Sequence, residues 1–219
     1  MKNNAELQKD VQDSITWEPL LNAAEIGVTV KDGVVTLTGV VDSYSKKLEA
    51  EDAAKKVTGV KAVVEKIEIK YGSDWGKKDD NEIATEVLNA LKRDWRIPSD
   101  KVKVKVEKGL VTLAGELQWN YQKEAAKHAL INLRGVKSVS NNITIKSEIQ
   151  DHIEKKDIES ALKRNWSIDD RDIKVNVSGH KVALAGTVNS WYQKDEASRI
   201  AWNAPGVWTV DNELVVECY

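Results

Sequence analysis

The chain of 219 residues contains no phenylalanine, one methionine, three prolines and one cysteine. The single cysteine, Cys218, excludes an internal disulfide and does not indicate a cellular compartment. No stretch approaches the roughly eighteen apolar residues of a membrane-spanning helix. The first ten residues are polar and have no apolar segment typical of a secretory signal. We therefore expect a cytoplasmic protein if Met1 is the native start, and a periplasmic one if a signal has been removed.

Signatures of catalysis are also missing. The three histidines, His128, His152 and His180, are scattered and make no metal-ligand spacing with one another or with Cys218. There is no nucleophile elbow and no phosphate-binding loop. The acidic clusters resemble turn and cap residues rather than a calcium loop; they comprise Asp79, Asp80, Asp169, Asp170 and Asp172. The sequence predicts a protein that is not an enzyme and has no metal site or cofactor.

What the chain does contain is one pattern repeated three times. A strand-like segment ending in glycine occurs at residues 33–39, 109–115 and 180–186, and a Gly-Val pair follows each at the same spacing. A unit of about 70 residues is long enough for a small domain. We expect domains at residues 1–72, 78–147 and 151–219. The glycines that define the pattern are Gly33, Gly39, Gly59, Gly109, Gly115, Gly135, Gly186 and Gly206.

The middle repeat predicts the order helix, strand, strand, helix, strand. A first helix capped by Asp80 or Asn81 carries apolar residues near period four and stops before Pro98. Residues 101–106 alternate lysine and valine as a strand does, and residues 107–109 form a tight turn into the return strand at 110–114. A second helix is expected over about 118–133, ended by Gly135, and a last strand over 138–146. The fold class is α+β, with three tandem α-β-β-α-β domains, each a three-stranded mixed sheet with two helices on one face.

Two helices on one face leave the other face of each sheet open. The middle domain is basic, with 12 lysines and arginines against 7 acidic residues over 81–147. Its open face would present Lys101, Lys103, Lys105 and Lys146. These lysines either meet an anionic surface or are a solvated face that discourages strand-edge association.

Aromatic residues gather where each second helix begins: Tyr44 in the first repeat, Trp119 and Tyr121 in the second, Trp191 and Tyr192 in the third. They either bind a lipid or protein partner, or the tyrosines pack under the helix as a local lid. Three more tryptophans end the first helices and are interpreted as anchors in the core or directly beneath the surface: Trp17, Trp95 and Trp166. Trp202 and Trp208, found only in the third repeat, are candidates for contact with a neighbour or a second copy.

The Gly-x-Val-x-Leu-x-Gly segment at 109–115, with Gly135-Val136 before the last strand, resembles the BON domain, the bacterial osmotically inducible and nodulation domain. The resemblance covers nearly the whole chain in three copies; the third departs by having His180 where the turn glycine would align. It implies a non-enzymatic module of stress or envelope proteins, proposed to bind phospholipid. It supplies no binding residues that can be carried over by position.

Two function classes follow. The first is a non-enzymatic, stress-related binding protein that associates with anionic phospholipid through the basic middle domain and the aromatic loops. The second is a structural or scaffolding protein whose sheet faces and tryptophans mediate domain stacking or self-association. A small-ion or osmotic sensor follows from the resemblance alone. A nucleic-acid partner is disfavoured, because there is no Gly-x-x-Gly clamp and the isoelectric point is near 6.0.

Overall fold

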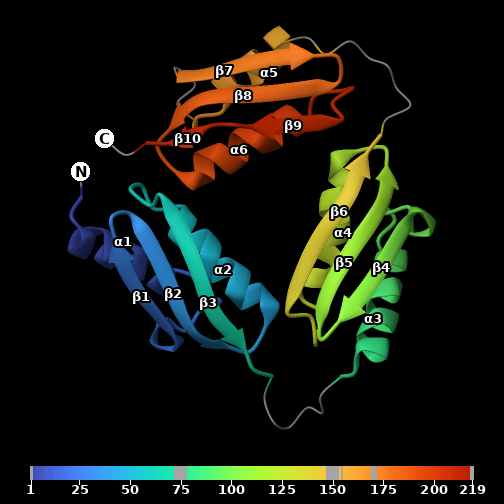
Figure 1. The fold of residues 1–219 in the computed structure, drawn as a ribbon, viewed down its shortest axis with the longest axis horizontal. Coiled ribbons are helices and arrows are strands. Elements are labelled where there is room, and N and C mark those ends of the chain that lie inside the picture. The colour runs from blue at the N-terminus through green and yellow to red at the C-terminus, as the bar shows by residue number, and fades with distance from the viewer. Residues whose placement is uncertain (1, 72–77, 147–152, 154, 169–171, 218–219) are drawn as a thin grey trace. The chain divides into compact units, whose positions relative to one another are not determined.

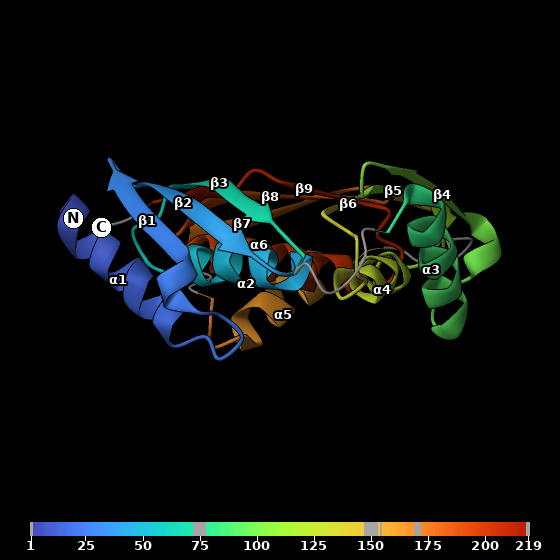
Figure 2. The ribbon, with the colours of Figure 1, turned by 90° about the horizontal axis from the view of Figure 1, so that it is seen from below.

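The computed structural model describes residues 2–71, 78–146, 153, 155–168 and 172–217. Each repeat forms its own sheet and carries two helices (Figure 1). Viewed from below, the helices of the first and middle repeats lie on one side of their sheets (Figure 2). The predicted α+β fold with three tandem α-β-β-α-β domains is therefore confirmed.

The first domain comprises α1 (Asn4–Thr16), β1 (Ile26–Lys31), β2 (Val34–Val41), α2 (Tyr44–Lys55) and β3 (Ala62–Ile69), and its sheet has the order β1-β2-β3. The middle domain comprises α3 (Asp80–Arg93), β4 (Val102–Glu107), β5 (Leu110–Leu117), α4 (Asn120–Ile131) and β6 (Ser138–Ile145). Its β4 is antiparallel to β5, and β6 is parallel to β5. Short 3-10 turns at Ala23–Glu25 and Ser99–Lys101 precede β1 and β4.

The third domain comprises α5 (Lys155–Arg164), β7 (Ile173–Ser178), β8 (Lys181–Val188) and α6 (Trp191–Trp202), followed by β9 (Thr209–Asn212) and β10 (Val215–Val216). Both β9 and β10 pair in parallel with β8, so they are two pieces of the expected third strand. The strand is interrupted at residues 213–214, where Leu214 turns into the core and is buried.

Apolar spacing explains the packing of the first helices. Leu7, Val11 and Ile15 of α1 recur every four residues and are buried, as the period of an amphipathic helix requires. The same spacing buries Ile83, Val87 and Leu91 of α3. The alternating valines of the hairpin strands and the alanines of the second helices complete each core.

Several predicted boundaries in the middle domain need correction. Asp79, rather than Asp80 or Asn81, caps α3: its side chain accepts the amide of Glu82, and the Glu82 carboxylate accepts the amide of Asp79. The helix ends at Arg93, before Trp95. The second helix spans 120–131 rather than 118–133, and β6 ends at Ile145.

The glycine that closes each hairpin strand has a specific steric cause. A Cβ built on Gly115 would lie 2.1 Å from the carbonyl oxygen of Lys101, and Gly115 has φ of +144°. Gly39 and Gly186 meet the carbonyl oxygens of Glu25 and Asp172 in the same way, at 2.0 and 1.8 Å. Glycine is therefore required at this position of the motif, because two backbone segments approach so closely that no side chain fits between them.

The hairpin turn explains why the third repeat tolerates His180. In the first two repeats both turn residues have positive φ, at Asp32-Gly33 and Lys108-Gly109. In the third, only Gly179 does, so the next position accepts a side chain. His180 stacks on Trp208 with ring centroids 4.0 Å apart, and its Nδ1 lies 2.8 Å from the carbonyl oxygen of Gly206.

A candidate binding end on the middle domain

The topology of the middle domain brings the candidate residues to one end. The start of α3 is fixed beside the hairpin turn, because the Asp80 carboxylate accepts the amides of Lys108 (2.7 Å) and Gly109 (3.0 Å). Fourteen residues at about 1.5 Å each carry the helix some 21 Å to the opposite end of the sheet. The end of α3, the start of β4, the end of β5, the start of α4 and the end of β6 therefore share one end of the domain. We call it the aromatic end, and the opposite one the turn end.

Trp95 is the most exposed large apolar residue of the aromatic end. Its side chain is 89% exposed, whereas Ile97, two residues later, is buried. The interpretation of Trp95 as a core anchor is therefore wrong: the helix stops at Arg93, and the turn directs Ile97 inward and Trp95 outward.

The other two repeats also expose the tryptophan that follows the first helix. Trp166 is 95% exposed while Ile168 is buried, and Trp17, at the end of α1, is 85% exposed. All three tryptophans expected in the core are thus among the most exposed apolar residues described. For Trp95 and Trp166, the signal that could have shown this is the spacing Trp-x-Ile, because one core site cannot hold both side chains. Trp17 is followed by Glu18 and Pro19 and lacks this signal.

The turn that presents Trp95 is braced. Asp94 Oδ1 accepts the amide of Arg96 at 3.0 Å, which makes an Asx turn with Trp95 at its apex. The Arg96 guanidinium also donates to both Asp94 oxygens, at 2.9 Å from Nε to Oδ1 and 2.6 Å from Nη2 to Oδ2. This hydrogen bonding holds the pKa of the Asp94 carboxyl below its ordinary value. The Asp94 carboxyl is therefore ionised at neutral pH, as an acceptor of these hydrogen bonds must be.

The turn at Trp166 is held by a neutral side chain, Asn165, in place of Asp94. Asn165 Oδ1 accepts the amide of Ser167 at 3.0 Å, and Asn165 Nδ2 donates to Glu196 of α6 at 2.7 Å. Hydrogen bonds from Arg199, and secondarily from Asn165, lower the pKa of the Glu196 carboxyl. Two repeats thus use different chemistry to present a tryptophan at the same place.

The charge around Trp95 is mostly basic. Lys92 and Arg93 are exposed in the last turn of α3, and Lys101 and Lys146 are exposed where β4 begins and β6 ends. The acidic residues at this end are Asp94, which is bonded to Arg96, together with Asp100 and Glu116. The aromatic end combines an apolar ring with an excess of positive charge.

Of the middle-domain residues selected as binding candidates from the sequence, some lie at the aromatic end and the others lie along strand β4. Lys101, Lys146, Trp119 and Tyr121 lie at the aromatic end, where Tyr121 is 52% exposed and Trp119 is half-buried. Lys103 and Lys105 are exposed along the edge strand β4, and Lys105 pairs with Glu107 at 3.1 Å. The open lysine face therefore exists, but only part of it adjoins the aromatic residues.

The corresponding loop of the third domain contains Trp191 and Tyr192. Trp191 is half-buried, with Lys194 Nζ 5.2 Å from its ring centroid, and Tyr192 is 43% exposed. The alternative prediction was that the tyrosine packs under the second helix as a lid. Tyr44 is buried and fits this prediction, whereas Tyr121 and Tyr192 are exposed and do not. Trp202 packs against the core of its own domain.

The remaining candidates were the acidic clusters and the possible metal ligands. Asp79 and Asp80 act as cap and clamp, as expected of turn residues. No group of three or more potential metal ligands occurs in the described part of the chain. None of the helices described there has the length and apolar character needed to cross a membrane. Asp169, Asp170, His152 and Cys218 lie outside the described residues.

Comparison with known proteins agrees with this architecture. Residues 3–71, 79–147 and 150–218 each match the BON domain. The chain belongs to the BON domain family. This BON protein is 34% identical over 129 residues to osmotically-inducible protein Y of Escherichia coli (strain K12), a match that covers 58% of this chain and 64% of that relative. The match thus spans less than two thirds of the length of the curated relative.

Solved structures give only a distant likeness. The C-terminal domain of CdsD, the structural protein of the type III secretion system of Chlamydia trachomatis, has 16% identity and a TM-score of 0.26, with 99% of this chain and all of that chain covered. A second CdsD structure gives 15% identity and the same TM-score. A TM-score this low has no bearing on function.

Proposed function

We propose that this BON protein is a non-enzymatic, peripheral binder of anionic phospholipid surfaces, and that the aromatic end of the middle domain makes the contact. The observation that carries the proposal is the 89% exposure of Trp95 on a braced turn amid basic side chains. Tryptophan favours the headgroup region, where its ring is in an apolar setting and its N–H remains hydrated. Basic residues nearby supply attraction to anionic lipid.

The brace supports binding because it lowers the entropic cost of ordering the turn at the surface. The Asp94–Arg96 fork and the Asx turn hold Trp95 outward before any contact occurs. Each lysine or arginine near an anionic leaflet adds on the order of 1 kcal/mol, which falls as salt screens the charges. Binding should therefore have a salt-sensitive part from the lysines and a less salt-sensitive part from Trp95.

The physiological setting proposed is osmotic stress. This rests on the name of the curated relative, osmotically-inducible protein Y, and on membership in the BON family.

The test is co-sedimentation with vesicles of phosphatidylglycerol and phosphatidylcholine, and with phosphatidylcholine alone, at about 50 and 500 mM salt. We expect binding to the anionic vesicles only, weakened by salt and abolished at low protein concentration in the double variant Lys101→Glu/Lys146→Glu. The matched control is Lys108→Glu/Lys137→Glu, which changes the net charge equally at the turn end. Equal loss in both variants would show that net charge alone, rather than the aromatic end, is responsible.

A structural role is the second candidate, favoured by the surroundings of Trp17. This exposed tryptophan adjoins exposed Leu20 and acidic Glu18, a setting that suits a protein partner better than an anionic lipid. If vesicles do not bind and sedimentation velocity shows association lost in Trp17→Ala, the scaffold replaces the lipid proposal.

A further inference from the structure

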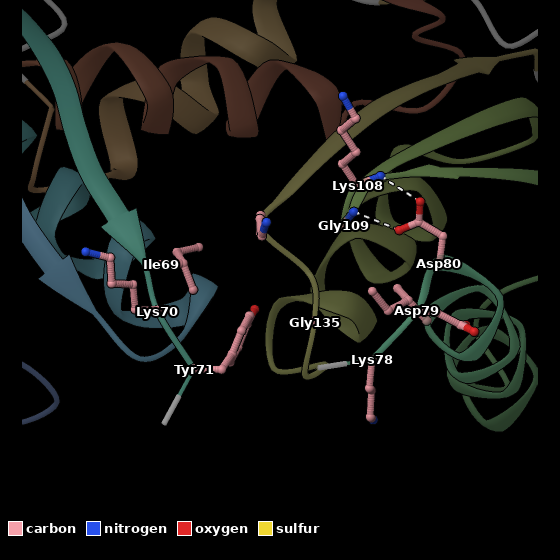
Figure 3. Close-up of a pocket in the computed structure, with 11 residues that line it drawn as sticks. Ile69, Lys70, Tyr71, Lys78, Asp79, Asp80, Lys108, Gly109 and Gly135 are labelled. Carbon is pink, nitrogen blue, oxygen red and sulfur yellow. Dashed lines mark hydrogen bonds between the residues drawn. The ribbon is translucent and has the colours of Figure 1, made fainter. Parts of the chain in front are cut away.

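A pocket of about 620 Å³ lies at the turn end of the middle domain, away from the aromatic end (Figure 3). Volumes of this size are typical of sites for small organic molecules. The start of α3, the hairpin turn, the segment before β6 and the stretch 69–71 contribute its walls. The lining residues are Ile69, Lys70, Tyr71, Lys78, Asp79, Asp80, Ile83, Lys108, Gly109, Gly135 and Lys137.

The acidic side chains of the pocket are already occupied. Both Asp80 oxygens accept backbone amides of the turn, as Figure 3 shows, and Asp79 accepts the amide of Glu82. Lys78 is paired with Glu86. These groups stabilise the fold, and among the described lining residues they leave no carboxylate for Lys108 or Lys137.

Lys108 and Lys137 are the uncompensated charges. Both are exposed, and neither has a side-chain hydrogen bond or ion pair within the described residues. They extend from adjoining segments, because the amide of Lys137 donates to the carbonyl of Gly109 at 2.9 Å. Two amines at one rim create a positive potential that an anion would relieve.

The interior of the pocket is apolar. Ile83 is buried and Ile69 is half-buried. The Tyr71 hydroxyl donates to the carbonyl of Val136 at 2.7 Å, so its polar atom is satisfied and its ring forms a wall. An inorganic anion would gain nothing from these surfaces, whereas an organic anion would bury apolar area.

We propose that this pocket binds a small organic anion, with its acidic group between Lys108 and Lys137 and its apolar body against Ile83 and Tyr71. The pocket lies at the opposite end of the domain from the aromatic end, and this proposal does not depend on the proposed binding of phospholipid.

The test uses 8-anilinonaphthalene-1-sulfonate as the anionic probe and N-phenyl-1-naphthylamine as its uncharged analogue, titrated into the full chain. We expect saturable binding of the sulfonate at one site, and at least about tenfold weaker binding of the neutral probe. Lys108→Gln/Lys137→Gln should raise the sulfonate dissociation constant about tenfold or more. The matched control, Lys103→Gln/Lys105→Gln, removes the same charge from the open face and should leave it unchanged.

Amide shifts at Gly109 and Gly135 should report the bound probe, and circular dichroism should show that both double variants are folded. Equal affinity for the neutral probe, equal loss in the control, or displacement by millimolar inorganic phosphate alone would overturn the proposal. Vesicle binding should persist in Lys108→Gln/Lys137→Gln, which separates a free organic anion from a lipid headgroup as the ligand.

Discussion

Replacing Trp95 by alanine tests the aromatic end most directly. The side chain is 89% exposed and makes little contact with the domain, so the free energy of unfolding should change by less than about 0.5 kcal/mol. A tryptophan offers roughly 200 Å² of burial. If half of this enters the headgroup region at about 25 cal/mol per Å², Trp95 contributes about 2.5 kcal/mol to binding.

The expected result is a vesicle dissociation constant raised roughly 60-fold, at every salt concentration that permits measurement. Vesicle flotation is the suitable assay, because the chain has eight tryptophans and intrinsic fluorescence would not isolate one. Leu88→Ala is the control, since Leu88 is an exposed apolar residue of α3 outside the aromatic end. A change of less than about threefold in Trp95→Ala, or an equal change in the control, would refute insertion of Trp95.

Two further predictions concern stability. Gly115→Ala should destabilise the middle domain by about 3 kcal/mol or more and lower its melting temperature by roughly 12 °C, because the new Cβ meets the carbonyl of Lys101; a melting temperature within about 2 °C of wild type would contradict this. Burial, together with the nearby Glu18, raises the pKa of Glu49, and Lys56 opposes the shift. The folded state therefore binds this proton more tightly than the unfolded state, so the contribution of Glu49 to stability falls as the pH rises above its ordinary pKa of 4.5. Glu49→Gln should unfold at a higher temperature than wild type at pH 7, with the difference vanishing near pH 4; the reverse order at pH 7 would show that the Lys56 ion pair dominates.

Much of the fold follows from the sequence because it depends on local periodicity. The four-residue spacing of Ile83, Val87 and Leu91 specifies a helix with one buried face. The alternation over 101–106 specifies a strand with lysines on the outer face, and those lysines are exposed as predicted. Repetition of the closing glycine also predicted three domains, although the steric reason for it became visible only when Lys101 and Gly115 were brought together.

Periodicity failed at the ends of the helices, where the direction of the chain depends on capping. Trp95 falls near the helical period of α3 and so was assigned to the core. Asp94 instead forms a turn with Arg96, and Ile97 takes the core position. Side-chain hydrophobicity cannot decide between a tryptophan and an isoleucine two residues apart, whereas a capping hydrogen bond can.

The sequence by itself determined the order of helices and strands, the number of domains and the open lysine face, since these depend on the spacing of apolar residues and glycines along the chain. Tertiary structure alone decided which aromatic residues face solvent and which charges share an end of the domain. It brought Lys101, Lys146 and Tyr121 to the same end of the domain as Trp95, through the direction of α3 and the parallel pairing of β6 with β5. It also placed Lys108 beside Lys137 at the opposite end, because the backbone pairing there joins residues far apart in sequence.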